Sequence, residues 1–147
     1  MSSMNIKAKD IMTEIIVSIH ENAFIKDAAH LMLRDRISGL LVINQKKKIV
    51  GILTLTDFLK IIDRLADGKN DDFVGNLLKC RTLKVRDVMT KNICSIGHEM
   101  TLRSVIKMMI NKNIHTFPVL KGRKLFGVVG RRDIINAVFY FSTRKTS

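Results

Sequence analysis

The chain contains an internal repeat, and this repeat restricts its fold more than any other feature of the sequence. With an offset of 77 positions, Asp10-Ile11-Met12-Thr13 falls on Asp87-Val88-Met89-Thr90. Further along, with an offset of 76, Gly51-Ile52-Leu53-Thr54-Leu55-Thr56-Asp57 falls on Gly127-Val128-Val129-Gly130-Arg131-Arg132-Asp133. A copy of about 60 residues buries too little apolar surface alone. We therefore expect two copies of one unit that share a core.

Both copies predict the same elements: a short strand, a helix, a strand, a polar turn, a strand and a helix. In each copy four apolar residues have the i, i+3, i+4, i+7 spacing of one helix face. They are Ile25, Ala28, Ala29 and Met32 in the first copy, and Leu102, Val105, Ile106 and Met109 in the second. Residues 44–48 predict a hairpin tip that is one residue longer than its counterpart at 121–124. The predicted fold class is mixed α/β (α+β), with two β-α-β-β-α copies.

The repeat also predicts the domain boundaries. The first copy is expected at residues 7–66 and the second at residues 84–141. Residues 67–83 begin with a polar stretch and are expected to form a linker with one turn of helix at 73–78. Residues 142–147 are short and polar, which predicts a frayed tail.

Composition is typical of a folded protein that is not secreted. Hydrophobic residues make up 46% of the chain, which is enough to fill a core. No run of about 18 uncharged apolar residues is present to span a membrane, and the first ten residues lack the apolar segment of a secretory signal. Cys80 and Cys94 have neither the CxxC spacing of a metal site nor the density of a disulfide scaffold. We expect a cytoplasmic protein with Cys94 in its core.

Positive charge is concentrated in the second half of the chain. The net charge is +13, and residues 1–77 contain 11 Lys and Arg against 10 Asp and Glu, which leaves 15 against 3 for the rest. Such a field attracts nucleotides, nucleic acid and acidic membrane surfaces alike. It therefore favours an anionic partner without identifying it.

Thr54-x-x-Asp57 stands where a predicted strand turns into a helix, and it permits two interpretations. The two side chains could satisfy free N–H groups at the start of the helix, as in a capping box. Alternatively, Asp57 could accept hydrogen bonds from the vicinal diol of a ribose while the free amides bind phosphate. In the second copy Gly130 has no side chain with which to cap, yet Asp133 is retained. This retention favours the ligand interpretation.

Three further residues bear on ligand binding. Arg131 and Arg132 begin the second such helix, where an acidic residue would suit the helix dipole better. The pair is either a phosphate clamp, with Arg132 as the better candidate, or a solvated surface pair. His115 precedes a strand that contains Pro118, which predicts an edge strand or an interrupted ladder. Free backbone groups there could bind the edge of a purine, or His115 could be structural.

Signs of catalysis are absent from the sequence. It has no nucleophile with an identifiable base, no GxxxxGK[ST] phosphate loop and no HExxH motif. His20, His30 and His98 lack the spacing of metal ligands. We therefore expect neither an enzyme nor a metal site.

The linked motifs resemble those of a known family. D-h-M-T (h, apolar), h-P-V on a strand and G-h-h-[ST]-x-x-D before a helix are together similar to the cystathionine-β-synthase (CBS) domain family. Their repetition over residues 7–141 resembles its tandem pair, the Bateman module. The resemblance implies two repeats packed with pseudo-twofold symmetry, and two clefts that bind AMP, ADP, ATP or S-adenosylmethionine. It also implies a homodimer of modules. Members of the family act as energy or metabolite sensors, either attached to enzymes, channels or transporters or as free-standing proteins.

The resemblance also implies ligand-binding residues, because each cleft of the family takes its Thr and Asp from one repeat and its base-contacting segments from the other. The first cleft would combine Thr54, Thr56, Asp57, Asn92, Ile93, His115, Thr116 and Pro118. The second would combine Ile15, Ile16, Ser38, Gly39, Gly130, Arg132 and Asp133. The second cleft departs from the family pattern, since Gly130 replaces the hydroxyl residue and Leu41 replaces the usual proline.

The leading hypothesis is a stand-alone regulatory module. An adenine nucleotide would bind between the repeats, as a signal and not as a catalytic cofactor, and change how two modules pair or which separate effector protein binds. Nucleic-acid binding through the basic second half is an alternative, although one Tyr and no Trp leave few platforms for base stacking. A ligand-free dimerisation scaffold is a third hypothesis. The sequence predicts no membrane partner.

Overall fold

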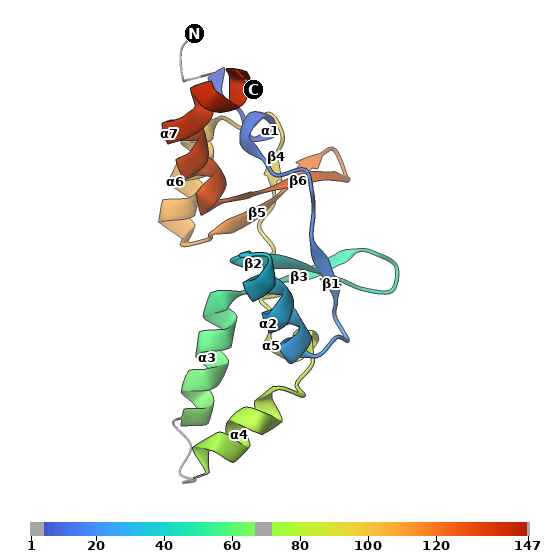
Figure 1. Ribbon diagram of the computed structural model, residues 1–147. Helices are drawn as coiled ribbons and strands as arrows, with labels where there is room; N and C mark the ends of the chain where they lie inside the picture. The colour runs from blue at the N-terminus through green and yellow to red at the C-terminus, as the bar shows by residue number, and fades with distance from the viewer. Residues whose placement is uncertain (1–4, 67–71, 147) are drawn as a thin grey trace. The chain divides into compact units, whose positions relative to one another are not determined.

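The computed structural model of the chain describes residues 5–66 and 72–146, which form helices and two separate three-stranded sheets (Figure 1). The chain divides into two compact units. Unit 1 comprises the described residues of Met1–Ile16 and Cys94–Ser147, and unit 2 those of Val17–Ile93. The predicted mixed α/β fold class is confirmed.

Unit 2 is built on a sheet with the strand order β1-β2-β3. The strands β1 (Ser18–His20) and β2 (Gly39–Ile43) pair in parallel, and β2 pairs with β3 (Ile49–Thr54) in an antiparallel hairpin. The parallel pair requires a crossover connection, which is supplied by α2 (Ile25–Arg34). After the hairpin come the helices α3 (Leu55–Ala66), α4 (Phe73–Cys80) and α5 (Val85–Val88).

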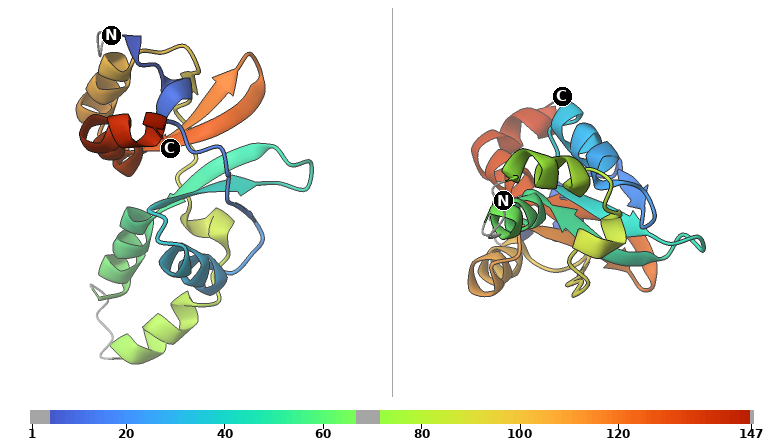
Figure 2. Two further views of the ribbon diagram at one scale, coloured as in Figure 1. Left: turned by 45° about the horizontal axis from the view of Figure 1, so that its top comes forward. Right: turned by 90° about the horizontal axis from the view of Figure 1, so that it is seen from below.

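Unit 1 repeats this arrangement with the strand order β4-β5-β6. Its elements are α1 (Ala8–Ile11), β4 (Ile96–Gly97), α6 (Leu102–Lys112), β5 (Thr116–Lys121), β6 (Lys124–Gly130) and α7 (Arg131–Thr146). Figure 2 shows α6 and α7 together on one side of the β5–β6 hairpin, whose tip projects beyond them. The strand and helix order predicted for each copy is therefore confirmed.

Each unit has its own apolar core, in place of the shared core expected from the sequence, and each core is formed largely by the helix faces that the spacing predicts. In unit 2, Ile25, Ala28 and Met32 of α2 are buried, and in unit 1, Leu102, Val105 and Met109 of α6 are buried. The strands contribute the rest, including Leu40, Val42 and Leu53 in one unit and Phe117, Val119 and Val129 in the other. Ala29 and Ile106, the remaining members of the two faces, are half-buried.

Each unit is completed by a short segment from the other sequence copy. Strap 1 (residues 6–13, with α1) belongs to the first copy but packs in unit 1, where Ala8 and Ile11 are almost fully buried. Strap 2 (residues 83–90, with α5) belongs to the second copy but packs in unit 2, where Val85 is fully buried. The sequence copies and the structural units therefore differ by an exchange of straps.

Backbone hydrogen bonds dock the two straps in matching ways. In unit 1 the amide of Ala8 donates to the carbonyl of Met100 at 2.8 Å. In unit 2 the amide of Val85 donates to the carbonyl of Ala23, also at 2.8 Å. Because both donor and acceptor are 77 positions apart in the two units, the repeat extends to the way in which each strap is held.

Three details differ from the sequence predictions. Pro118 lies in β5, the middle strand of its sheet and not an edge strand; however, β4 is so short that it pairs with β5 only at Val119 and Leu120. The interrupted-ladder alternative is therefore correct. Helix α7 continues to Thr146, through the region predicted as a tail, since no Gly or Pro interrupts it. The predicted turn of helix in the linker is the longer α4, and residues 67–71 of that linker lie outside the described residues.

Candidate ligand site

Asp57 lies in the first turn of α3, and its carboxylate is held from two directions. Its Oδ2 accepts hydrogen bonds from the amide (2.8 Å) and the hydroxyl (3.1 Å) of Thr54. The amide of Asp57 donates back to Thr54 Oγ1 at 3.3 Å. Its Oδ1 accepts from the hydroxyl of Thr90, in strap 2, at 2.9 Å. The capping-box interpretation of Thr54-x-x-Asp57 is therefore confirmed, whereas ligand binding by Asp57 stays a prediction.

Asp133 has the matching position in the first turn of α7. Its Oδ2 accepts a hydrogen bond from the amide of Gly130 at 2.7 Å, and its Oδ1 accepts from the hydroxyl of Thr13, in strap 1, at 2.8 Å. Because Gly130 has no hydroxyl, Asp133 has one hydrogen-bond donor fewer than Asp57. Asp133 is half-buried, whereas Asp57 is only 5% exposed.

Strap 2 ends by pairing with β3 just before Asp57. Thr90 and Ile52 exchange two backbone hydrogen bonds of 2.9 Å each. Beside this pair, a Cβ on Gly51 would lie 2.5 Å from Sδ of Met89, which is closer than side chains tolerate. Met89 therefore packs where only a glycine leaves room. In unit 1, Thr13 pairs with Val128, and Met12 packs against Gly127.

The predicted site residues are distributed over both units. Unit 2 contains Ser38, Gly39, Thr54, Thr56, Asp57, Asn92 and Ile93, and unit 1 contains Ile15, Ile16, His115, Thr116, Pro118, Gly130, Arg132 and Asp133. Within unit 2, Gly39 pairs with Thr54 in the sheet, and within unit 1, Thr116 pairs with Gly130. Each predicted cleft therefore has members in both units, and its assembly into one site stays a prediction.

The accessibility of these residues varies widely. Thr56, Asn92 and Arg132 are exposed, and Ile15 is 84% exposed. Thr116 and Pro118 are buried, so their side chains support the sheet. His115 is half-buried, and its Nε2 lies 3.1 Å from Oδ1 of Asn113. The exposed polar groups are the ones that a ligand could reach directly.

Sequence reasoning missed the two threonines that contact the aspartates. Thr13 and Thr90 were visible only as parts of the repeated D-h-M-T motif, and their hydrogen bonds explain why the motif recurs. In each motif the aspartate accepts a hydrogen bond from the backbone amide three residues earlier, at Lys7 for Asp10 and at Lys84 for Asp87. The methionine of each motif packs on the glycine that starts the other motif, Gly127 or Gly51. The threonine donates its hydroxyl to the aspartate at the end of that motif, Asp133 or Asp57. Co-occurrence of D-h-M-T with G-h-h-x-x-x-D was the available signal.

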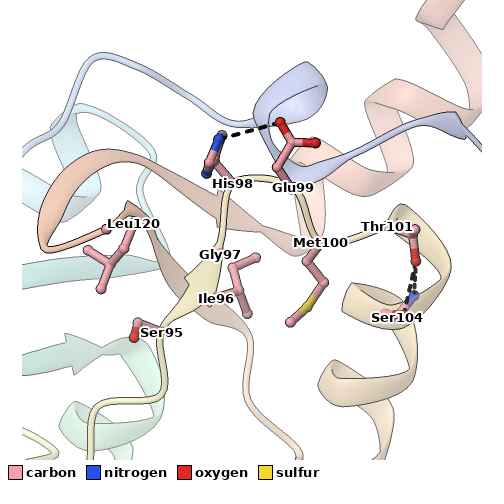
Figure 3. A pocket seen from close by; sticks show the side chains of 10 residues that line it. Ser95, Ile96, Gly97, His98, Glu99, Met100, Thr101, Ser104 and Leu120 are labelled. Carbon is pink, nitrogen blue, oxygen red and sulfur yellow. Dashed lines mark hydrogen bonds and ion pairs between the residues drawn. The ribbon is translucent and has the colours of Figure 1, made fainter.

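A separate pocket of about 660 Å³ lies in unit 1 between β4, the turn that follows it and the start of α6 (Figure 3). Three of its lining residues, Gly97, Thr101 and Ser104, stand at positions that the repeat matches with the larger His20, Phe24 and Asp27 of unit 2. None of the predicted site residues lines it. In Figure 3, Thr101 interacts with Ser104 and His98 with Glu99: the hydroxyls of Thr101 and Ser104 are 2.9 Å apart, and His98 Nε2 lies 3.4 Å from Glu99 Oε1.

The cysteines and the histidines provide no further site. Cys94 is partly buried against the core of unit 1, which is less than the predicted burial. Cys80 is also partly buried, and this burial raises the pKa of its thiol. Within the described residues, no three His, Cys, Asp or Glu side chains are grouped to hold a metal ion. No helix among residues 5–66 and 72–146 has the length and apolar character that crossing a bilayer requires.

Comparison with known proteins identifies the class. The family model of the CBS domain matches residues 8–64 and again residues 85–140, so the chain belongs to the CBS domain family and is a tandem CBS pair. Its sequence is 31% identical to the uncharacterized protein MJ1426 of Methanocaldococcus jannaschii, over 88% of this chain and 89% of that protein. Other relatives are longer: the chain spans only 23% of a homoserine O-acetyltransferase of Methanosalsum zhilinae, to which it is 30% identical over 88% of its own length.

Solved structures share the fold over nearly the whole chain. The CBS-domain containing protein ATU1752 of Agrobacterium tumefaciens superposes with a TM-score of 0.79, at 20% identity, and covers 95% of this chain and 98% of that one. CBSX2, whose structure was determined in complex with AMP, superposes with a TM-score of 0.72, at 20% identity, and covers 93% of this chain and 98% of that one. At this level of identity the likeness concerns the fold.

Proposed function

We propose that this CBS pair is a regulatory module that binds an adenine nucleotide at sites built around Asp57 and Asp133. The observation that carries the proposal is the geometry of Asp57 within unit 2. Thr90 binds its carboxylate, and the chain continues from Thr90 directly to Asn92 and Ile93. The carboxylate and the segment to which the family resemblance assigns ribose and base binding are thus held within a few residues of each other.

The remaining contacts of the ligand come from the family resemblance. His115, Thr116 and Pro118 would complete the site of Asp57, and Ser38 and Gly39 that of Asp133. Arg132, exposed beside Asp133, would bind phosphate. CBSX2 in complex with AMP supports an adenosine ligand. AMP, ADP, ATP and S-adenosylmethionine share the adenosine part, so all four belong in the test.

The output of the module is a change in its association with another protein chain, either a second copy or a separate effector. Apolar side chains are exposed at matching positions of two helices: Leu59 and Ile62 of α3 are 64% and 40% exposed, and Ile135 and Val138 of α7 are 56% and 57% exposed. Such repeated apolar surface is typical of an interaction face and supports a homodimer. A ligand regulates this association only if it binds the two association states with different affinity.

Calorimetry with the four adenosine compounds tests the proposal. The wild-type protein is expected to bind at least one of them, and the double variant Asp57→Ala/Asp133→Ala to lose that binding. Circular dichroism of the double variant controls for folding, because the aspartates also cap helices. Equal binding by a folded double variant would refute the sites. Sedimentation velocity with and without the bound compound then measures whether the ligand changes association.

Nucleic-acid binding is a second candidate, supported by the two hairpin tips. Lys46, Lys47 and Lys48 in one tip, and Lys121, Arg123 and Lys124 in the other, are all exposed, and no ion pair engages them among the described residues. Contacts to phosphate alone predict an affinity that falls steeply with salt. Filter binding of RNA and DNA between about 50 and 200 mM salt tests this, and no binding at about 50 mM would exclude it.

A further inference from the structure

We infer that unit 1 carries the tighter sugar-binding position, and that Gly130 is the residue that makes it so. This inference rests on the proposed function, because it assumes that Asp57 and Asp133 bind the ribose of a nucleotide. The missing hydroxyl at Gly130, by which the second cleft departs from the family pattern, is then an advantage for sugar binding.

The two carboxylates differ in the number of hydrogen-bond acceptor positions that they still have free. An ionised carboxylate offers about four, two on each oxygen. On Asp57, both positions of Oδ2 are used by Thr54 and one position of Oδ1 by Thr90. A ribose diol, which donates two hydrogen bonds, would therefore have to displace a threonine hydroxyl from Asp57.

Asp133 does not have this restriction. Among the described residues, its Oδ2 accepts a hydrogen bond only from the amide of Gly130, and its Oδ1 only from the hydroxyl of Thr13. One acceptor position is left on each oxygen, as a bidentate contact with a vicinal diol requires. The difference between the two carboxylates is the hydroxyl that Thr54 provides and Gly130 lacks.

The two aspartates also differ in their accessibility to a ligand. Asp57 is only 5% exposed, whereas Asp133 is half-buried. A Cβ added at Gly130 would have its nearest neighbours, Oδ2 of Asp133 and the carbonyl of His115, at 3.6 Å, which is ordinary van der Waals distance. A Cβ is therefore tolerated at position 130, directly beside the carboxylate of Asp133.

The charge of the neighbouring side chains differs as well. The two residues before Asp133 are Arg131 and Arg132, whereas Leu55 and Thr56 precede Asp57. Both arginines are exposed, and neither takes part in an ion pair within the part of the chain that the structure describes. A sugar phosphate held by Asp133 would therefore have cationic neighbours from the same turn of helix, whereas one held by Asp57 would have none from its own turn.

Reciprocal substitutions test the inference. Calorimetric titration of the wild-type protein with AMP is compared with Asp133→Ala and Asp57→Ala. Removing one charged acceptor typically costs tenfold or more, about what a lost hydrogen bond to a charged group predicts. We expect Asp133→Ala to weaken the tighter binding event by about tenfold or more, and by more than Asp57→Ala does.

A second pair of variants isolates the hydroxyl. Gly130→Thr and Gly130→Val add side chains of nearly equal size, but only threonine can occupy Oδ2 of Asp133. We expect Gly130→Thr to weaken AMP binding more than Gly130→Val does. In unit 2, Thr54→Val removes the competing hydroxyl from Asp57 and should strengthen the weaker binding event. Thermal unfolding of each variant confirms that it is folded.

Two results would overturn the inference in distinguishable ways. If the wild-type protein binds AMP and Asp57→Ala abolishes the tighter event while folded Asp133→Ala retains it, the assignment to unit 1 is wrong but the proposed function stands. Equal effects of Gly130→Thr and Gly130→Val would likewise reject the role of the hydroxyl. If the wild-type protein binds none of AMP, ADP, ATP and S-adenosylmethionine, the proposed function fails and this inference fails with it.

Discussion

Thr90 donates its hydroxyl to the carboxylate of Asp57 at 2.9 Å, and these two residues come from different copies of the sequence repeat. The same bond, between Thr13 and Asp133, is 2.8 Å long in the other unit. A hydrogen bond that is preserved at both equivalent places defines how the end of each strap is attached. The candidate ligand residue of each unit is therefore also the anchor of a segment from the other repeat.

Replacement of Thr90 by valine should destabilise unit 2. The variant keeps the shape of the side chain but leaves a buried carboxylate oxygen without its donor, which costs about 1–3 kcal/mol. Urea unfolding followed by circular dichroism measures the loss. Thr90→Ser, which retains a hydroxyl, is expected to recover most of it. Thr13→Val should cost less, because Asp133 is more accessible to water, and a Thr90→Val variant as stable as the wild type would contradict the anchoring role.

Replacement of Gly51 by alanine should also loosen strap 2. The new Cβ would stand 2.5 Å from Met89 Sδ and 3.0 Å from the carbonyl oxygen of Thr90. The methionine can move but the backbone cannot do so without breaking its pairing, so we expect a cost of about 1–3 kcal/mol. Gly97→Ala is the matched control, since no atom lies within 4 Å of a Cβ there. Equal stability of the two variants in urea would show that the glycine is not needed for docking.

The stability of unit 1 should depend on acid through Glu99. A hydrogen bond from Lys7 and a smaller contribution from Lys9 lower the pKa of Glu99 from 4.5 to about 2. Because the folded pKa is depressed, this stabilisation is complete above pH 4.5 and is lost as the pH falls toward about 2. His98, the other titratable group facing Glu99, lies 3.4 Å away.

Comparison with Glu99→Gln measures this contribution. The variant is expected to be slightly less stable than the wild type at pH 7, and the difference should vanish near pH 2. Because the ion pairs of Glu99 with Lys7 and Lys9 are exposed, the difference in stability between the variant and the wild type should also shrink at high salt. A difference that grows on acidification would contradict the assignment.

Replacement of Phe117 by alanine should destabilise the core of unit 1 strongly. Phe117 is fully buried in the middle strand β5, and loss of a buried Phe costs about 3–5 kcal/mol. Ile110→Ala on α6, where the side chain is 73% exposed, is the control and should change the unfolding free energy little. Calorimetric unfolding of the two variants provides the measurement, and a Phe117→Ala loss below 1 kcal/mol would contradict the described core.

Much of the fold could be predicted from the sequence, because the repeat doubles every local signal. The apolar spacing of Ile25, Ala28 and Met32 is weak evidence alone, but its recurrence at Leu102, Val105 and Met109 makes a helix in each copy a firm prediction. The turn at residues 44–48 was found in the same way. These features are local, and local periodicity in the sequence reports them directly.

The exchange of straps could not be predicted in this way. The repeat shows that Asp10-Ile11-Met12-Thr13 and Asp87-Val88-Met89-Thr90 are equivalent. It does not show which unit each segment packs against, because both units offer an equivalent glycine and aspartate: Gly51 and Asp57 in unit 2, and Gly127 and Asp133 in unit 1. The middle-strand position of Pro118 could not be predicted for a different reason. Strand β4 has only two residues, too few for a visible alternation, so the neighbour that makes β5 a middle strand leaves no signal in the sequence.

The crossed straps bear on how the two halves of the chain depend on one another. The straps contribute some of the least exposed side chains of the described residues. Ala8 and Ile11 of the first sequence copy lie in the core of unit 1, and Val85 of the second copy lies in the core of unit 2. Cleavage of the polypeptide between residues 67 and 82 would yield two fragments. Each fragment would lack the strap that completes its core and would carry the strap that belongs to the core of the other. Such fragments could complete their cores only by exchanging straps, so each unit depends on both sequence copies for its stability.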